Sequence, residues 1–203
     1  RFPAWMVGSG GDTVWMSPTA SPRTLIPDST RWDEPNILSL ISSARNEVLL
    51  QFLSYSTTAR DRSHYDSLDN AMRRAAERGV KVKLIVSDWE KGSPSDTPLK
   101  SLSSVPNIEV KFSAIPEWSG GYISYARVEH CKYICVDAKT FWLGTSNAEK
   151  SYFYTSRNLG VIAHSEKLAS MVKEIFMKSW TGPYTELVKP GVEYQPREHG
   201  ERK

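Results

Sequence analysis

Continuous apolar runs and helically spaced apolar residues alternate along the first half of the chain. The runs Glu47–Ser54 and Val80–Val86 are typical of strands that are buried on both faces of a sheet. Between them, apolar residues recur at helical spacing: Leu68, Met72, Ala75 and Ala76. A strand, a helix and a strand of these lengths form a βαβ unit, so we expect the two strands to be parallel and their crossover right-handed.

The same patterns predict further elements on either side of this unit. Asp33 is a suitable N-cap for a helix over residues 34–45, and two more apolar runs, at residues 108–112 and 159–163, predict strands. Ser165 is a suitable N-cap for a second long helix, whose apolar stripe we expect to pack in the core: Leu168, Met171, Val172, Ile175 and Phe176. The pattern therefore predicts an α/β fold with a mixed, largely parallel sheet flanked by helices on both faces.

Three segments lack such patterns. Residues 1–30 are rich in Pro, Gly, Ser and Thr and are interpreted as a connector, with one possible edge strand at Val14–Met16. Residues 91–104 are rich in Ser, Pro and Lys, which predicts a surface loop. The polar tail over 188–203 has little to fold around, so we expect it to be mobile and the α/β lobe to span residues 31–187.

Composition narrows the class of protein without defining its function. The 203 residues are 39% hydrophobic and 24% charged, which excludes a disordered chain, and no apolar run approaches the ~20 residues of a membrane span. The net charge of +3 tolerates a polyanionic partner but does not require one. Cys131 and Cys135 lie four residues apart on one expected strand, which places their Cα atoms about 13 Å apart. This distance is too long for a disulfide between them, so we expect two free thiols.

Candidate chemistry is concentrated between residues 125 and 147. His130 and Lys132 stand two apart in a segment rich in Val, Ile and Tyr, and on a strand this spacing places both side chains on one face. Asp137 follows five residues later. A second short apolar run leads to Gly144, where a turn can bring Asn147 back to the same face.

These residue types suit a phosphate group. A neutral imidazole can attack phosphorus, while a lysine and an asparagine amide beside it stabilise the nonbridging oxygens, and this chemistry needs neither a metal ion nor another cofactor. The alternative is a hydrogen-bonded core imidazole, which is the usual explanation for a single histidine in a strand.

The spacing His130-x-Lys132-x4-Asp137-x6-Gly144-Thr145-x-Asn147 resembles the signature of the phospholipase D superfamily, in which Thr145 is more often Ser. The resemblance implies that His130, Lys132 and Asn147 are catalytic, that a phosphohistidine intermediate forms, and that Asp137 mainly supports the motif strand. It also implies two such motifs facing each other across a pseudo-twofold axis. The second half-site then belongs either to an N-terminal lobe, on a separate or missing segment, or to a homodimer mate.

Segments from about Trp15 to Trp180 are similar to the C-terminal lobe of the phospholipase D3/D4 branch. That branch is known for lysosomal 5′ exonucleases acting on single-stranded nucleic acid, which implies a lysosomal or lumenal location as one possibility. Ala148 stands where branch members often have Trp, and the branch often has Glu where this chain has Asp137.

Candidate substrate-binding residues surround the motif. Trp89, just after the strand 80–86, can stack a base, cover a lipid or simply pack on the sheet as a rim aromatic, and Tyr125 can stack a base. Arg127 and Thr145 are further substrate-binding candidates, and we expect the loop 117–124 to line the site. Basic residues favour single-stranded nucleic acid: Arg60, Arg62, Arg73, Arg74, Lys81, Lys83 and Arg127. A phospholipid substrate, or a non-catalytic module that binds membranes or assembles an envelope, remain the alternatives.

Overall fold

The computed structural model describes residues 5–9 and 12–199 of the chain. The strands in these residues are β1 (Trp5–Ser9), β2 (Asp12–Ser21), β3 (Glu47–Gln51), β4 (Lys81–Ser87), β5 (Ile108–Ser113), β6 (Tyr133–Val136), β7 (Thr140–Gly144), β8 (Asn158–His164) and β9 (Thr185–Leu187). The α-helices are α1 (Asp33–Ser42), α2 (Ser67–Glu77), α3 (Asp96–Ser103), α4 (Lys150–Tyr154) and α5 (Glu166–Thr181). Three short 3-10 helices complete them: η1 (Arg23–Leu25), η2 (Ser29–Arg31) and η3 (Asp88–Glu90).

All nine strands form one sheet in the order β1-β2-β8-β7-β6-β3-β4-β5-β9. The expected βαβ unit is confirmed, because β3 and β4 are parallel and α2 connects them, and β5 extends the parallel part. The other neighbours are antiparallel, so the sheet is mixed as expected, but the expectation that it is largely parallel is wrong. Hairpins account for much of the difference, since a short turn can join only antiparallel strands.

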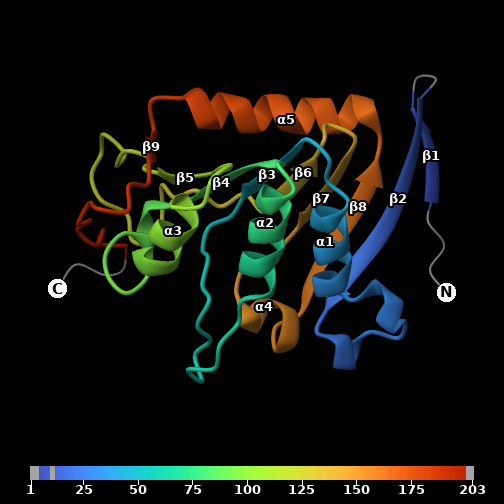
Figure 1. Ribbon diagram of the computed structural model, residues 1–203, viewed down its shortest axis with the longest axis horizontal. Helices are drawn as coiled ribbons and strands as arrows, with labels where there is room; N and C mark the ends of the chain where they lie inside the picture. The colour runs from blue at the N-terminus through green and yellow to red at the C-terminus, as the bar shows by residue number, and fades with distance from the viewer. Residues whose placement is uncertain (1–4, 10–11, 200–203) are drawn as a thin grey trace.

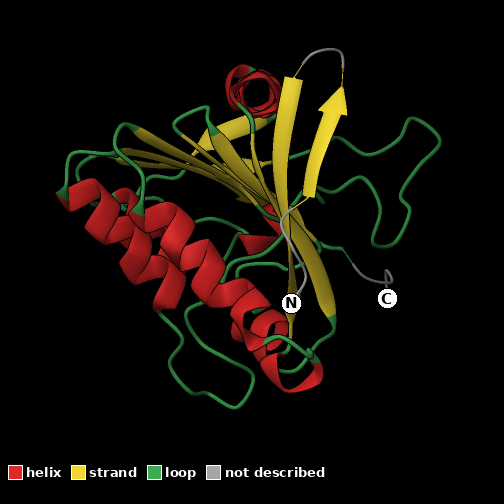
Figure 2. Ribbon diagram, turned by 90° about the vertical axis from the view of Figure 1, so that its right-hand side faces the viewer, coloured by secondary structure: helices red, strands yellow, loops and turns green. Residues whose placement is uncertain are grey.

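Helices cover both faces of the sheet, as expected. Helix α5 lies alone across one face, and α1, α2 and α3 lie on the other (Figures 1 and 2). The α5 side is packed by a cluster that includes Leu49, Tyr133 and Phe176. The opposite side holds a larger cluster, in which Trp142, Phe52 and Met72 are fully buried.

The expected core stripe of α5 is only partly correct. Phe176 is buried, but Met171 and Ile175 are 52% and 54% exposed. Ala169 and Trp180 are buried with Phe176, so the helix turns a different line of residues towards the sheet. The apolar residues of α5 form two adjacent stripes along the helix surface, and a single helix lying over one face of a sheet can bury only one of them.

Three segments differ from the sequence-based expectations. The possible edge strand at residues 14–16 belongs to β2, which has ten residues and is paired on both sides, by β1 and β8. The expected loop 91–104 contains α3, which buries Leu99 and Leu102. The tail packs on the lobe as far as it is described: Val188 is buried, Tyr194 contacts Phe112 edge to face, and the Arg197 guanidinium donates to the backbone oxygen of Ile115 at 3.0 Å.

Candidate active site

The polar motif residues gather at one end of the sheet. Because β6 is antiparallel to β3 and to β7, the residues just before β6, just after β3 and just after β7 share that end. The parallel strand β4 also ends there and leads directly into η3. Open α/β sheets commonly bind ligands at the carboxyl ends of their parallel strands.

His130 and Lys132 precede β6, whereas the sequence pattern placed them on a strand. The regular ladder begins at Tyr133, and the preceding segment includes positive φ angles at Tyr125 (57°) and Arg127 (56°). Lys132 is nevertheless fixed at the strand end, because its backbone oxygen accepts a hydrogen bond from the backbone of Gly144 at 3.1 Å.

The two side chains have opposite environments. The His130 imidazole is exposed, and among the side chains of residues 14–199 it has no hydrogen-bond partner, so it is not the hydrogen-bonded core imidazole considered as the alternative. Lys132 is only 7% exposed, and its ammonium donates to the backbone oxygen of His130 at 2.9 Å. Burial lowers the pKa of Lys132, while Cys131 and Glu129 act in the opposite direction. The pair therefore combines a freely accessible imidazole with a partly desolvated cation.

Asn147 is fully buried and only half satisfied. Its Oδ1 accepts a hydrogen bond from the backbone of Leu53, just beyond β3, at 3.3 Å. Its Nδ2 has no hydrogen-bond partner. A buried amide donor without an acceptor costs about 1–3 kcal/mol of stability.

Asp137 lies at the other end of β6, about 20 Å along the chain from His130 at strand spacing. It occupies the β6–β7 turn, where it and Ala138 both take positive φ angles, 52° and 51°. Its carboxylate accepts hydrogen bonds from the backbone nitrogens of Arg45, Asn46 and Glu47 at 2.8–2.9 Å. Burial alone would raise the pKa of Asp137, but these donors hold it below its usual value.

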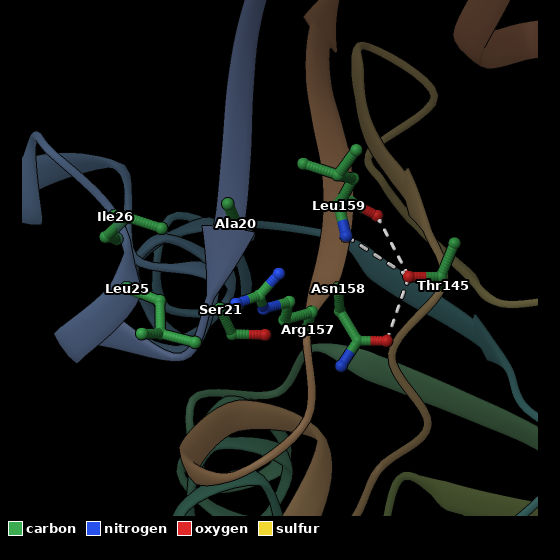
Figure 3. Close-up of a pocket in the computed structure, with 8 residues that line it drawn as sticks. All are labelled: Ala20, Ser21, Leu25, Ile26, Thr145, Arg157, Asn158 and Leu159. Carbon is green, nitrogen blue, oxygen red and sulfur yellow. Dashed lines mark hydrogen bonds between the residues drawn. The ribbon is translucent and has the colours of Figure 1, made fainter.

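Thr145 lines a groove of about 560 Å³ between β8 and the segment after β2. Its hydroxyl donates to Oδ1 of Asn158 at 2.9 Å. Figure 3 shows Leu25 and Ile26 on one side of this groove and Thr145, Asn158 and Leu159 on the other. Leu25 and Leu159 are 56% and 69% exposed, so an apolar surface adjoins the motif.

Trp89 and Tyr125, two candidates for base stacking, contact each other, and the tail takes part in this contact. Trp89 stacks on His199 with ring centroids 4.5 Å apart and meets Tyr125 edge to face at 6.2 Å. Arg127 donates to the backbone oxygen of Pro116 at 3.0 Å, in the loop that leads towards the motif. An aromatic platform therefore exists, and a tail imidazole already occupies one of its faces.

Three acidic residues outside the motif positions have distinctive environments: Glu90, Glu129 and Glu149. Glu129 is buried and accepts from the backbone of Cys131 at 3.2 Å, which fixes the segment that carries His130. Glu90 has a pKa raised to about 8, first by burial and then by the charge of Glu149. Glu129 stands next to His130 in the sequence, whereas Glu90 and Glu149 are 59 positions apart, so the sequence alone did not indicate that they interact.

The described residues hold no group of three or more His, Cys, Asp or Glu side chains arranged to bind a metal ion. Nor does any described helix have the length and hydropathy needed to cross a membrane. Both cysteines are free thiols, as expected, with Cys131 exposed and Cys135 buried.

Comparison with known proteins identifies the family. Residues 37–180 match the family described as cardiolipin synthase, PLD-like domain, so the chain belongs to the phospholipase D superfamily. It is 32% identical to the 5′-3′ exonuclease PLD3 of Rattus norvegicus over 181 residues, and 30% identical to phospholipase D Y of Dictyostelium discoideum over 159 residues. These matches cover 82% and 75% of this chain but only 37% and 36% of the relatives, so the chain spans less than half of their length.

A solved structure has the same fold and a similar size. Nuc from Salmonella typhimurium, a phospholipase D family member, superposes with a TM-score of 0.65 at 21% identity. The superposition covers 87% of this chain and 99% of the Nuc chain. One lobe of this kind is therefore an entire chain in one relative and less than half of the chain in others.

Proposed function

We propose that this chain supplies one half of a metal-independent phosphodiesterase site, in which His130 is the nucleophile or the general acid. The observation that carries the proposal is the buried, unpartnered Nδ2 of Asn147, at the same sheet end as the buried ammonium of Lys132 and the exposed imidazole of His130. Lys132 and Asn147 bind the nonbridging phosphate oxygens. Asp137 supports the motif hairpin and does not touch substrate.

In the nucleophilic role, an imidazole nitrogen of His130 forms a bond to phosphorus while the bond to the leaving oxygen breaks. The leaving oxygen takes a proton from an acid of the second half-site. Water then attacks the phosphohistidine, gives its proton to that same group, and releases His130. The second half is a lobe of the same fold on another polypeptide segment, and a second copy of this chain is the alternative. Sizes support this pairing, because the lobe is a whole chain in Nuc and less than half of the chain in the exonuclease relative.

We favour single-stranded nucleic acid as the substrate, cleaved from its 5′ end. Support comes from the relative that is named a 5′-3′ exonuclease, and from the aromatic pair Trp89 and Tyr125 beside the motif. The basic residues give less support for a nucleic-acid substrate than their number indicates, because Arg73 pairs with Asp69 and Lys83 pairs with Glu109. A phospholipid substrate remains the alternative, since another relative is named a phospholipase D.

The test compares two substrates in the presence of EDTA. Nucleotide release from a 5′-hydroxyl single strand should exceed choline release from phosphatidylcholine vesicles, and chelation should leave the rate unchanged. His130→Ala should lower turnover by about 10⁴ or more without changing thermal stability, because the imidazole is exposed and unpartnered. His164→Ala is the matched control, an exposed histidine at the far end of β8.

Other outcomes of this comparison exclude parts of the proposal. Preferential choline release would reverse the choice of substrate, and loss of activity on chelation would contradict the metal-independent mechanism. A protein that hydrolyses neither substrate when the second lobe is supplied, yet binds vesicles, would be a membrane-binding module.

A further inference from the structure

The turn that presents Asn147 is tied to three different elements of the fold. Residues 145–147 follow β7, and each side chain contacts a different element: Thr145 reaches Asn158 on β8, Ser146 reaches Asp33 on α1, and Asn147 accepts from Leu53 after β3. The position of the Asn147 amide therefore depends on how the preceding residue is held.

Asp33 is a buried carboxylate at the first position of α1, with no exposed area. Its Oδ2 accepts from the Ser146 hydroxyl at 3.0 Å and its Oδ1 from the Trp142 indole nitrogen at 3.3 Å. Within the described part of the chain it forms no salt bridge. Burial raises the pKa of Asp33, and hydrogen bonds from Thr19, Ser146 and Trp142 oppose that rise. A carboxylate buried without a cation is costly, so its hydrogen bonds must contribute in return.

Trp142 connects the same carboxylate to the strand before the turn. Its indole is fully buried and fills the space beside two glycines: a Cβ on Gly144 would lie 2.3 Å from Cζ2, and one on Gly160 would lie 2.4 Å from Nε1. The last residue of β7 thus packs directly on a ring that Asp33 orients. One carboxylate holds both the strand end and the turn that follows it.

We propose that Asp33 is a positioning residue for the phosphate site, acting through Ser146 to aim the Asn147 Nδ2 at a phosphate oxygen. The inference rests on the proposed function, in which Asn147 binds phosphate. Asp33 touches no substrate. Its effect passes through the Ser146 hydrogen bond, so removal of that bond should weaken phosphate binding even though no ligand contact is deleted.

The experiment measures binding of inorganic phosphate to the whole chain by calorimetry, together with thermal unfolding. Ser146→Ala should weaken phosphate binding roughly five- to tenfold, the equivalent of one hydrogen bond. Thr19→Val is the matched control, because it removes another buried hydroxyl that bonds to Asp33 but does not lie on the turn. We expect Thr19→Val to destabilise the fold comparably and to leave phosphate affinity unchanged. Ser146→Thr retains the hydroxyl and should restore affinity.

A double-mutant cycle separates positioning from general stabilisation. In an Asn147→Ala background, Ser146→Ala should cause no further loss of affinity, since the amide that it positions is gone. Equal losses in both backgrounds, or equal losses for Ser146→Ala and Thr19→Val, would overturn the positioning role and leave the proposed function intact. Absence of phosphate binding by the unmodified chain would overturn the proposed function and the inference with it.

Discussion

Asp137→Ala tests whether the acidic position of the motif is an anchor or a catalytic group. Its carboxylate accepts three backbone hydrogen bonds, from Arg45, Asn46 and Glu47, residues that are 90–92 positions away in sequence. At about 0.5–1.5 kcal/mol for each partly exposed bond, the substitution should lower the free energy of unfolding by about 2–4 kcal/mol. Turnover should change less than about threefold under conditions where both proteins are folded, because His130 lies at the other end of β6.

The pH dependence has a definite sign. The pKa of Asp137 is lower in the folded chain than its usual value, so its contribution to stability is present above the unfolded pKa of about 3.9 and is lost as the pH falls through the lower, folded value. Urea unfolding followed by tryptophan fluorescence should therefore separate the two proteins at pH 7, and the gap should narrow below about pH 4.

Asp28→Ala is the control for this measurement. The Asp28 carboxylate also accepts two hydrogen bonds, but both come from Thr30 in the same turn, so its removal should lower the free energy of unfolding much less than the removal of Asp137. A hundredfold loss of turnover in Asp137→Ala, with the free energy of unfolding unchanged, would refute the anchoring role.

Three further predictions concern groups outside the motif. Glu90→Gln should leave the melting temperature unchanged near pH 4 and raise it relative to the unmodified chain at pH 9. Burial and the charge of Glu149 raise the pKa of Glu90 to about 8, so the cost of ionising Glu90 in the folded chain grows between these pH values, and equal melting temperatures at pH 9 would contradict this. Arg197→Gln should lower the free energy of unfolding in urea by about 3–5 kcal/mol, because it leaves the buried Asp88 carboxylate unpaired. Lys139→Gln removes an exposed ion pair with Glu166 and should lower it by less than about 0.5 kcal/mol; similar losses for the two variants would show that the tail contact is weak. Iodoacetamide at pH 8 should alkylate Cys131 on the order of a hundredfold more slowly than free cysteine. Although the residue as a whole is exposed, partial desolvation of its thiol and then the charge of Glu129 raise its pKa to about 11; a rate equal to that of free cysteine would exclude this environment.

The sequence predicted the elements whose pattern is decided locally. The parallel pair β3 and β4 appeared as continuous apolar runs, and the motif spacing identified the family. The backbone conformation of the motif was harder to predict from the sequence: His130 and Lys132 lie in a segment of strand-like composition, yet strand β6 begins only at Tyr133. Strand boundaries depend on where the neighbouring strand ends, which composition does not encode.

The remaining errors arise where distant segments meet. Helix α3 carries few apolar residues, and Leu99 and Leu102 become informative only once β5 is present beneath them. The tail was expected to be mobile because it is polar, but it contacts Asp88 and Trp89, which lie about a hundred residues away and could not be identified as its partners from the sequence. Likewise, the burial of Asp33 could not be predicted, since an acidic residue before a helix is most often a solvated N-cap.

The side chains of His130, Lys132 and Asn147 differ in how firmly the lobe holds them, and this difference suggests separate roles in binding and in turnover. Lys132 and Asn147 are buried, and each is fixed by one backbone group, so they lose little conformational freedom when a phosphate arrives. The exposed His130 ring has no such restraint within the described residues. Under the proposed function, the substrate or the second half-site therefore orients the imidazole, so phosphate affinity belongs to the single lobe and turnover to the completed pair.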